Sequence, residues 1–395
     1  MRHPVAGPAS PVPALAGRLA RVAPFLAMDV MAAASARERA GAQVVHMEIG
    51  QPSAPAPRPA IEAARRALDL GRVGYTDALG IPSLRERIAR HYGQAYGVDV
   101  SPERVVVTTG SSAGFVLAFL ALFDVGDRVA ITAPGYPAYR NILAALDLRP
   151  AVLPLREQDG FAMRAEGVAR LHAEAPLRGV LTMSPANPSG TMIGAEALAR
   201  IGETCRNAGL WWVSDEIYHG LTFEEPASTA LAHDPDAVVI NSFSKYYCMT
   251  GWRVGWIVVP ERLVRAVERL AQNLYISPPY LSQVAAEAAF DGAEEQEQVR
   301  AGYAANRALL LDELPRLGLG RMHPVDGAFY IYADVSRFTD DARAFCARML
   351  AEAGVATTPG LDFDPVEGRH HLRLSFAGSH EECREAVRRL GAWLG

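Results

Sequence analysis

The segment SFSKYYCMTGWRVGW, from Ser242 to Trp256, contains the only lysine of this 395-residue chain, Lys245. The chain has 39 basic side chains, and the other 38 are arginines. Arginine can replace lysine wherever only a positive charge is needed, but its guanidinium keeps its proton and cannot act as an amine nucleophile. A single lysine kept among hydroxyls and glycines therefore predicts covalent chemistry at Lys245, such as a Schiff base.

Outward from this segment, short runs rich in β-branched residues alternate with helix-like stretches such as residues 195–208. The runs cover residues 105–109, 128–132, 151–155, 179–183, 211–214, 238–241 and 255–259. This alternation predicts an α/β fold with a mostly parallel seven-stranded sheet and helices on both faces.

The pattern changes beyond residue 260 and predicts a smaller α+β domain. Helices are expected at 261–290, 294–314, 340–353 and 381–394, and strands at 322–325, 328–334 and 371–376. The expected organisation is an N-terminal arm over 1–45 that joins the small domain, a large domain over 46–285, and the small domain over 286–395.

Four polar clusters directly follow predicted strands: GSS at 110–112, SPANPSG at 184–190, DEIY at 215–218 and SFSK at 242–245. In parallel sheets, ligands bind outside the carboxyl ends of the strands. These four clusters therefore predict one shared site.

The bulk composition limits the classes of function. A net charge of −5 provides no basic surface for nucleic acid or anionic membranes, and no run of eighteen apolar residues could span a bilayer. The four cysteines show neither a CxxC pair nor zinc-ligand spacing, which predicts reduced thiols in a cytoplasmic protein and no metal site.

In these blocks the chain resembles the class I and II aminotransferases, pyridoxal-phosphate enzymes of fold type I. The resemblance extends from GQP at Gly50 to RLSFA at Arg373, and its most specific block combines Ser242, Ser244, Lys245 and Arg253. It implies that Lys245 binds the cofactor covalently and then moves the substrate proton. Both tasks need a neutral amine, so its pKa must lie below the usual value of about 10.4.

The resemblance also implies how the cofactor ring is held. Asp215 is expected to pair with the pyridine nitrogen and keep it protonated, which makes the ring an electron sink. Tyr218 and Asn187 are expected to hydrogen-bond the phenolic oxygen of the cofactor, and Tyr136 is expected to stack on its ring. Lys245, Asp215 and Tyr218 are thus the predicted catalytic residues.

For the cofactor phosphate, the resemblance implies backbone N–H groups at a helix start, hydroxyl groups and one arginine. The residues concerned are Ser111, Ser112, Ser242, Ser244 and Arg253. Tyr75 is expected to reach the phosphate of a neighbouring subunit, which implies a homodimer with shared active sites.

Substrate binding is assigned to Arg373, Asn187 and Gly50. Arg373 is expected to bind the α-carboxylate through two parallel hydrogen bonds, and Gly50 to let the backbone approach the substrate. Some aspartate-specific relatives carry a lysine at the position of Ser112, and the segment NLYISPPY at 273–280 is apolar. These two features favour a neutral or aromatic L-amino acid.

The predicted function is a ping-pong transfer of an amino group from an L-amino acid to a 2-oxo acid. Two alternatives remain open at this stage. A lyase of the same fold, either a C–S lyase or a cyclopropane-forming synthase, needs the same Lys245, Asp215 and Arg373. A non-catalytic, aminotransferase-like module that binds an effector is the other alternative.

Overall fold

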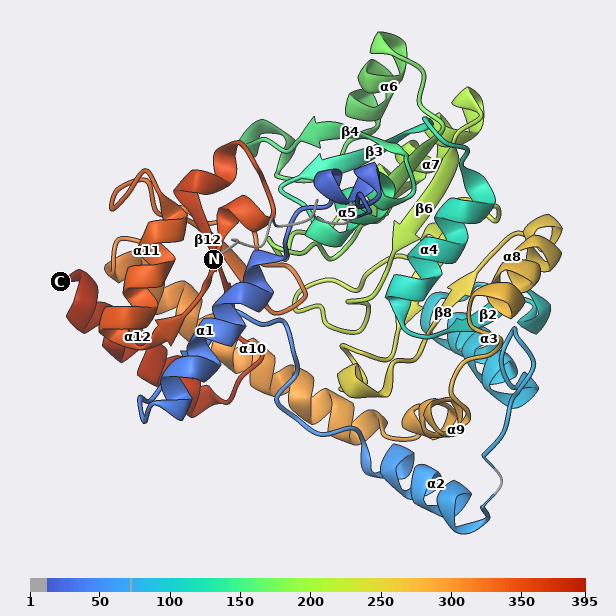
Figure 1. Cartoon of the computed structure of the whole chain (residues 1–395), viewed down its shortest axis with the longest axis horizontal. Helices are drawn as coiled ribbons and strands as arrows, with labels where there is room; N and C mark the ends of the chain where they lie inside the picture. The colour runs from blue at the N-terminus through green and yellow to red at the C-terminus, as the bar shows by residue number, and fades with distance from the viewer. Residues whose placement is uncertain (1–12, 72) are drawn as a thin grey trace, which may run out of the picture.

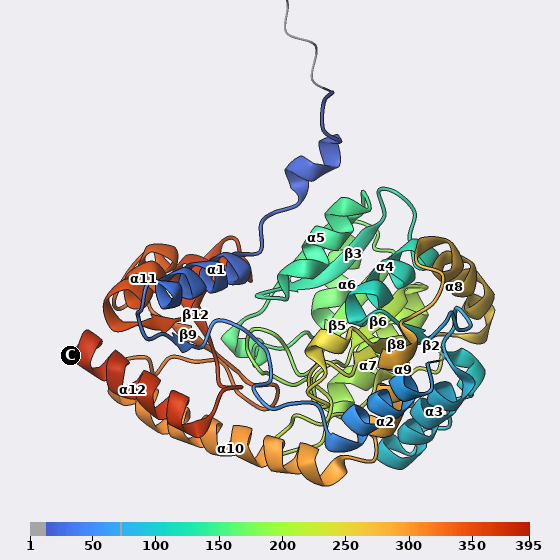
Figure 2. The same ribbon diagram turned by 60° about the horizontal axis from the view of Figure 1, so that its bottom comes forward.

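The computed structural model describes residues 13–71 and 73–395, so the first twelve residues of the expected arm lie outside the described part. The chain forms two lobes that face each other across a central gap between ribbons (Figures 1 and 2). The large lobe is built on a seven-stranded sheet, and the small lobe on a three-stranded sheet.

The seven-stranded sheet confirms the predicted fold class. Its strands are ordered β2-β8-β7-β6-β5-β3-β4, and only β8 runs antiparallel to its neighbours. The strands are β2 (Val105–Thr108), β3 (Arg128–Ala133), β4 (Arg149–Pro154), β5 (Gly179–Met183), β6 (Trp211–Asp215), β7 (Val238–Ser242) and β8 (Gly255–Val258). Each lies within two residues of a predicted run.

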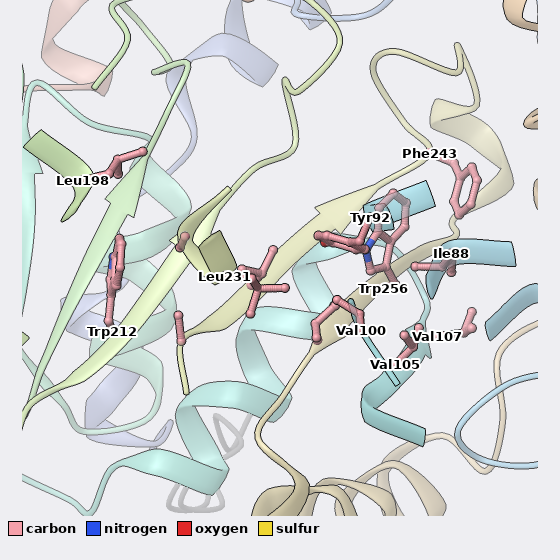
Figure 3. Close-up of a cluster of buried hydrophobic side chains, with 14 of the residues drawn as sticks. Ile88, Tyr92, Val100, Val105, Val107, Leu198, Trp212, Leu231, Phe243 and Trp256 are labelled. Atoms are coloured by element: carbon pink, nitrogen blue, oxygen red, sulfur yellow. The ribbon is translucent and has the colours of Figure 1, made fainter. Parts of the chain in front are cut away.

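Both faces of this sheet are buried, which explains its continuous apolar runs. Neighbouring residues of one strand contribute to different cores: Trp212 packs in one core and Val213 in the other. Figure 3 shows the first of these cores, where the indole N–H of Trp256 donates to the Tyr92 hydroxyl at 3.1 Å. The sheet is therefore a rigid platform for the side chains at its strand ends.

The helices of the large lobe are α2 (Arg58–Asp69), α3 (Pro82–Tyr96), α4 (Ser111–Leu122), α5 (Pro137–Ala145), α6 (Ala165–Glu174), α7 (Ala195–Ala208), α8 (Glu261–Leu274) and α9 (Tyr280–Ala289). The long helical region expected over 261–290 is divided into two helices, because residues 275–279 separate α8 from α9. Pro278 and Pro279 lie in this break, and proline has no N–H group with which to continue a helix.

In the small lobe, β9 (Tyr330–Asp334) and β11 (Thr358–Pro359) both pair antiparallel with β12 (His371–Ser375). Its helices are α11 (Ala342–Arg348), which continues as a π turn over Met349–Ala353, and α12 (His380–Leu394). The long helix α10 (Ala293–Arg316) runs below both lobes in Figure 2.

The strand expected at 322–325 is wrong. Only an isolated bridge joins Met322 to Ala333 there. Pro324 lies inside this stretch and cannot donate the N–H group that a strand ladder needs.

The N-terminal arm contains a short 3-10 helix (Gly17–Arg21), α1 (Leu26–Arg39) and β1 (Val45–His46). Strand β1 pairs parallel with β10 (Val355–Ala356), and α1 contacts β10 and β11 (Figure 1). From α1 onward the arm thus packs on the small lobe, whereas its 3-10 helix contacts α5 of the large lobe. Over the described ranges, no helix has the length and apolar character needed to cross a membrane.

Candidate active site

A cavity of about 250 Å³ lies at the carboxyl ends of the parallel strands and is lined by residues of the large lobe, the small lobe and the arm. All predicted site residues except Ser242 and Tyr75 line it. Those eleven are Gly50, Ser111, Ser112, Tyr136, Asn187, Asp215, Tyr218, Ser244, Lys245, Arg253 and Arg373.

Lys245 follows β7, and its Nζ donates a hydrogen bond to the carbonyl of Gly50 at 2.6 Å. Burial, together with the nearby charges of Arg373 and Arg253 and against that of Asp215, lowers the pKa of Lys245 to about 8. With this pKa, a substantial fraction of Lys245 is a neutral amine near physiological pH. Its partner at position 50 has to be glycine, because a Cβ atom there would lie 1.6 Å from the Tyr330 hydroxyl.

Asp215 is the last residue of β6 and is only 2% exposed. Its carboxylate accepts hydrogen bonds from the Tyr139 hydroxyl and from the N–H group of Ile217 at 3.1 Å. Burial raises the pKa of Asp215 to about 6, although the two hydrogen bonds and Lys245 act in the opposite direction. At pH 7 this buried group is thus mostly an anion that faces the cavity.

The adjacent Glu216 does not line the cavity. Its Oε1 accepts hydrogen bonds from the Ala230 N–H at 2.8 Å, the Thr229 hydroxyl at 3.1 Å and the Ser214 hydroxyl at 3.2 Å. Burial raises the pKa of Glu216 to about 8. Asp215 and Glu216 therefore differ at pH 7: Asp215 faces the cavity and is mostly ionised, whereas Glu216 does not face it and is mostly protonated.

Three tyrosines surround the space in front of Asp215. The hydroxyls of Tyr218 and Tyr330 lie 2.7 Å apart, and burial raises the pKa of Tyr218 well above its ordinary value. The ring of Tyr136 meets that of Tyr139 edge-on at 5.3 Å. Tyr136, Tyr218 and Tyr330 therefore line the cavity together with the Asp215 carboxylate and the Lys245 amine.

At one end of the cavity, α4 begins at Ser111 directly after Gly110, whose φ is +79°. A Cβ atom on Gly110 would lie 2.5 Å from the guanidinium of Arg253, so glycine admits the arginine here. Arg253 itself has a left-handed backbone with φ of 53°, which is uncommon for a residue other than glycine. Free N–H groups at a helix start beside a guanidinium form an anion site.

Ser244 lines the cavity, whereas Ser242 does not. The Ser242 hydroxyl accepts the N–H group of Ser244 at 3.1 Å and lies 3.0 Å from the carbonyl of Val254. The structure therefore gives Ser242 a supporting position rather than a direct contact with the cavity.

Arg373 lies at the centre of β12 and is 2% exposed. Its guanidinium donates to Asn187 Oδ1 at 2.9 Å and to the carbonyl of Glu48, and it lies 4.4 Å from the centre of the Tyr330 ring and 4.7 Å from that of Phe363. Within the described part of the chain, no carboxylate forms an ion pair with it. A buried cation of this kind favours an anionic ligand.

Two predicted elements lie outside the cavity of their own chain. Tyr75 is 84% exposed, and the apolar segment at 273–280 does not line the cavity either. Nine of the residues that line the cavity had not been predicted as site residues: Phe25, Ala27, Met28, Ile49, Gln51, Met183, Ile217, Thr250 and Tyr330. Tyr139 of α5, which donates to the Asp215 carboxylate, had not been predicted either. Its signal in the sequence is its place three residues after the predicted Tyr136, which is the N-cap of α5.

No group of three or more histidine, cysteine, aspartate or glutamate side chains that could hold a metal ion occurs in the described ranges.

Comparison with known proteins points to one family. Residues 42–390 match the family described as aminotransferase class I and II. The chain is 51% identical over 379 residues to a valine–pyruvate aminotransferase from Mycobacterium tuberculosis, covering 95% of this chain and 97% of that protein.

Solved structures agree. A crystal structure of an aminotransferase from Mycobacterium tuberculosis has a TM-score of 0.94 at 50% identity, covering 97% of this chain and 99% of that chain. Aspartate aminotransferase from Thermus thermophilus with maleate has a TM-score of 0.91 at 31% identity, covering 96% and 100%. The chain belongs to the class I and II aminotransferases, enzymes that use pyridoxal phosphate to transfer an amino group from an amino acid to a 2-oxo acid.

Proposed function

We propose that this aminotransferase acts on neutral, apolar L-amino acids, with valine as the model donor and pyruvate as the model acceptor. The observation that carries this proposal is the small number of cations at the cavity. Lys245, Arg253 and Arg373 are the cations among its described lining residues, and each has a role in the proposed site. No cation among these described residues is left to bind a second carboxylate of the substrate. Burying a carboxylate without a partner is costly.

The rest of the lining supports the same donor class. Six apolar side chains line the cavity: Phe25, Ala27, Met28, Ile49, Met183 and Ile217. The relative from Mycobacterium tuberculosis that is 51% identical bears the name valine–pyruvate aminotransferase. A branched aliphatic side chain would replace water against these walls.

The residues present suit pyridoxal phosphate. When bound, this cofactor supplies an aldehyde that condenses with amines and a ring that accepts the electron pair from the Cα–H bond. We assign its phosphate to the N–H groups at the start of α4, Ser244 and Arg253, with Ser242 as a support. Asp215 would hold a proton at the ring nitrogen, and its hydrogen bond from Tyr139 fixes the carboxylate.

In this assignment Lys245 carries the proton chemistry. With a pKa of about 8, the free amine could take a proton from the substrate Cα and return it to a carbon atom of the cofactor. Tyr218 and Asn187 would hydrogen-bond the phenolic oxygen of the cofactor. Arg373, held rigidly by Asn187 and the carbonyl of Glu48, would bind the α-carboxylate and so aim the Cα–H bond.

We further propose a cytoplasmic homodimer in which Tyr75 reaches the phosphate site of the partner subunit. The loop of Tyr75 and the apolar segment at 273–280 are joined by Gln283, whose Nε2 donates to Thr76 Oγ1 at 3.0 Å and to the carbonyl of Pro278 at 2.9 Å. Tyr75, Leu274 and Ile276 are all more than half exposed in the single chain. Such an apolar surface supports contact with a second copy.

The two lobes support the proposed division into an arm over 1–45, a large cofactor-binding domain over 46–285 and a small domain over 286–395. The arm would belong to the small domain, because β1 pairs with β10. Limited proteolysis of the purified protein tests these boundaries.

The donor class is tested by mixing the purified holoenzyme with single L-amino acids and following the cofactor absorbance. We expect valine to convert the cofactor to its amine form at least about 100-fold more efficiently than aspartate, because aspartate brings an unpaired carboxylate. Equal or faster conversion by aspartate would contradict the proposal. Release of ammonia without an acceptor would instead identify a lyase.

A further inference from the structure

We propose that Asp362 is a positioning residue that holds the entrance segment, defined here as Phe25–Met28, against the cavity and thereby gives the enzyme its selectivity for branched over smaller apolar donors. This inference rests on the proposed donor class. It concerns a contact between two parts of the chain that are 336 residues apart.

The contact is made by both oxygens of the Asp362 carboxylate. Oδ1 accepts the N–H group of Leu26 at 3.1 Å, and Oδ2 accepts that of Ala27 at 3.0 Å. Leu26 is the first residue of α1, and the residue before it, Phe25, provides no side-chain cap. The first N–H groups of a helix lack partners within the helix, and an anion there is further stabilised by the helix dipole. Asp362 therefore acts as the cap of α1 from a distant loop.

Asp362 is itself firmly held. It is 1% exposed and ends the short 3-10 helix Gly360–Asp362 of the small lobe. Its backbone carbonyl accepts a hydrogen bond from the guanidinium of Arg140 on α5, in the large lobe. The carbonyl of the next residue, Phe363, accepts the N–H group of Gly135 at 3.1 Å. The cap of α1 thus lies where the arm and both lobes meet.

A second contact holds the chain just before the entrance segment. Ala23 exchanges two hydrogen bonds of 3.2 Å with the side-chain amide of Asn141 on α5. Phe25 lies between this point and the Asp362 contact, and its ring meets that of Tyr136 edge-on at 6.0 Å. Because both ends are fixed, the position of the Phe25 ring is determined by them.

The entrance segment is a wall of the substrate cavity, since Phe25, Ala27 and Met28 all line it. Discrimination between side chains that differ by one methylene group depends on close apolar contact and reaches about 10- to 200-fold. If the wall can move, the larger side chain loses these contacts, while a methyl side chain loses little. Release of the Asp362 contact should therefore lower valine efficiency more than alanine efficiency.

The loop offers a matched control. Asp364, two residues on, accepts the N–H groups of Val366 at 2.8 Å and Glu367 at 3.1 Å through Oδ1 and caps its own loop rather than α1. The variants to compare are Asp362→Ala, Asp362→Asn and Asp364→Asn, each as the holoenzyme. Asparagine keeps one acceptor oxygen, so Asp362→Asn should retain part of the contact and guards against a folding defect in the alanine variant.

Two measurements test the proposal. Hydrogen exchange of the peptide that contains Leu26 and Ala27 should be faster in Asp362→Ala, intermediate in Asp362→Asn and unchanged in Asp364→Asn. In single-turnover reactions, the ratio of valine to alanine efficiency should fall by at least about tenfold in Asp362→Ala, through the apparent dissociation constant of valine rather than the maximal rate.

The outcomes separate the two proposals. Unchanged exchange at Leu26 and Ala27, or an equal loss for valine and alanine, would overturn the role of Asp362. An Asp364→Asn variant with the same loss of selectivity would do so as well. Wild-type enzyme that fails to react with valine would overturn the proposed donor class, while the exchange experiment would still decide whether Asp362 holds the arm.

Discussion

The rear and front walls of the cavity are built in different ways. The rear wall consists of Asp215, Ser244 and Lys245, which follow neighbouring strands of one buried sheet. The front wall consists of Arg373 and Tyr330 from the small lobe and the entrance segment from the arm. The rear wall carries proton and charge chemistry on a rigid platform, whereas the front wall depends on contacts between distant parts of the chain. Chemistry and substrate choice can therefore be altered separately.

The largest expected effect comes from the rear wall, at Lys245. A Lys245→Arg variant keeps a positive charge but loses the amine, so kcat should fall by at least about 10⁴-fold. The visible absorption of the lysine-bound cofactor should disappear, while circular dichroism of the fold remains. Appreciable turnover by this variant would remove Lys245 from the chemistry.

A smaller effect is expected when the two neighbouring acids are compared. Asp215→Asn removes the charge that faces the cavity, where we assign the cofactor ring, and we expect kcat to fall by about 10²- to 10³-fold. Glu216→Gln replaces a group whose pKa of about 8 leaves it mostly protonated at pH 7, so kcat should change by less than about tenfold. Steady-state kinetics of both variants checks the contrast, and equal losses would contradict it.

The smallest expected effect is on the pH dependence of cofactor capture. It involves Lys245 of the rear wall and Arg373 of the front wall. Below its pKa of about 8, Lys245 keeps its proton and cannot attack an aldehyde; above it, the amine is neutral and reactive. The rate at which apoenzyme captures pyridoxal phosphate should therefore rise with pH with a midpoint of about 8. Arg373→Gln removes a cation that disfavours the protonated amine, so the midpoint should move to higher pH.

A midpoint for the wild type that lies near that of an exposed lysine would contradict the buried setting of Lys245. A midpoint unaffected by Arg373→Gln would show that the charge of Arg373 does not contribute to the pKa of Lys245. Stopped-flow absorbance at several pH values measures both quantities.

The rear wall could be predicted from the sequence because its residues stand in short motifs directly after strands. Asp215 and Lys245 are positioned by the strands that precede them, so a local pattern is enough to place them. The same reasoning placed Ser242 with Ser244 in the site, but the Ser242 hydroxyl bonds to Ser244 and to the carbonyl of Val254, and only Ser244 lines the cavity.

The front wall could not be predicted in this way. Phe25 and Met28 stand in no motif, and the carboxylate that holds their segment lies more than 300 residues away. Tyr330 begins a buried strand whose apolar pattern gives no reason to expect a hydroxyl at the site. Contacts of this kind depend on how the lobes close on each other, which no local pattern specifies.

The near-absence of lysine has a consequence for the protein in a cell rich in sugars and metabolic aldehydes. Neutral lysine amines attack the carbonyl carbon of such compounds and form Schiff bases, so each exposed lysine is a site at which they can react. Here 38 arginines supply the positive charge, and the single ε-amine is enclosed beside Gly50. Glycation at ε-amines is thereby restricted to one position, which is the one assigned to the enzyme's own cofactor.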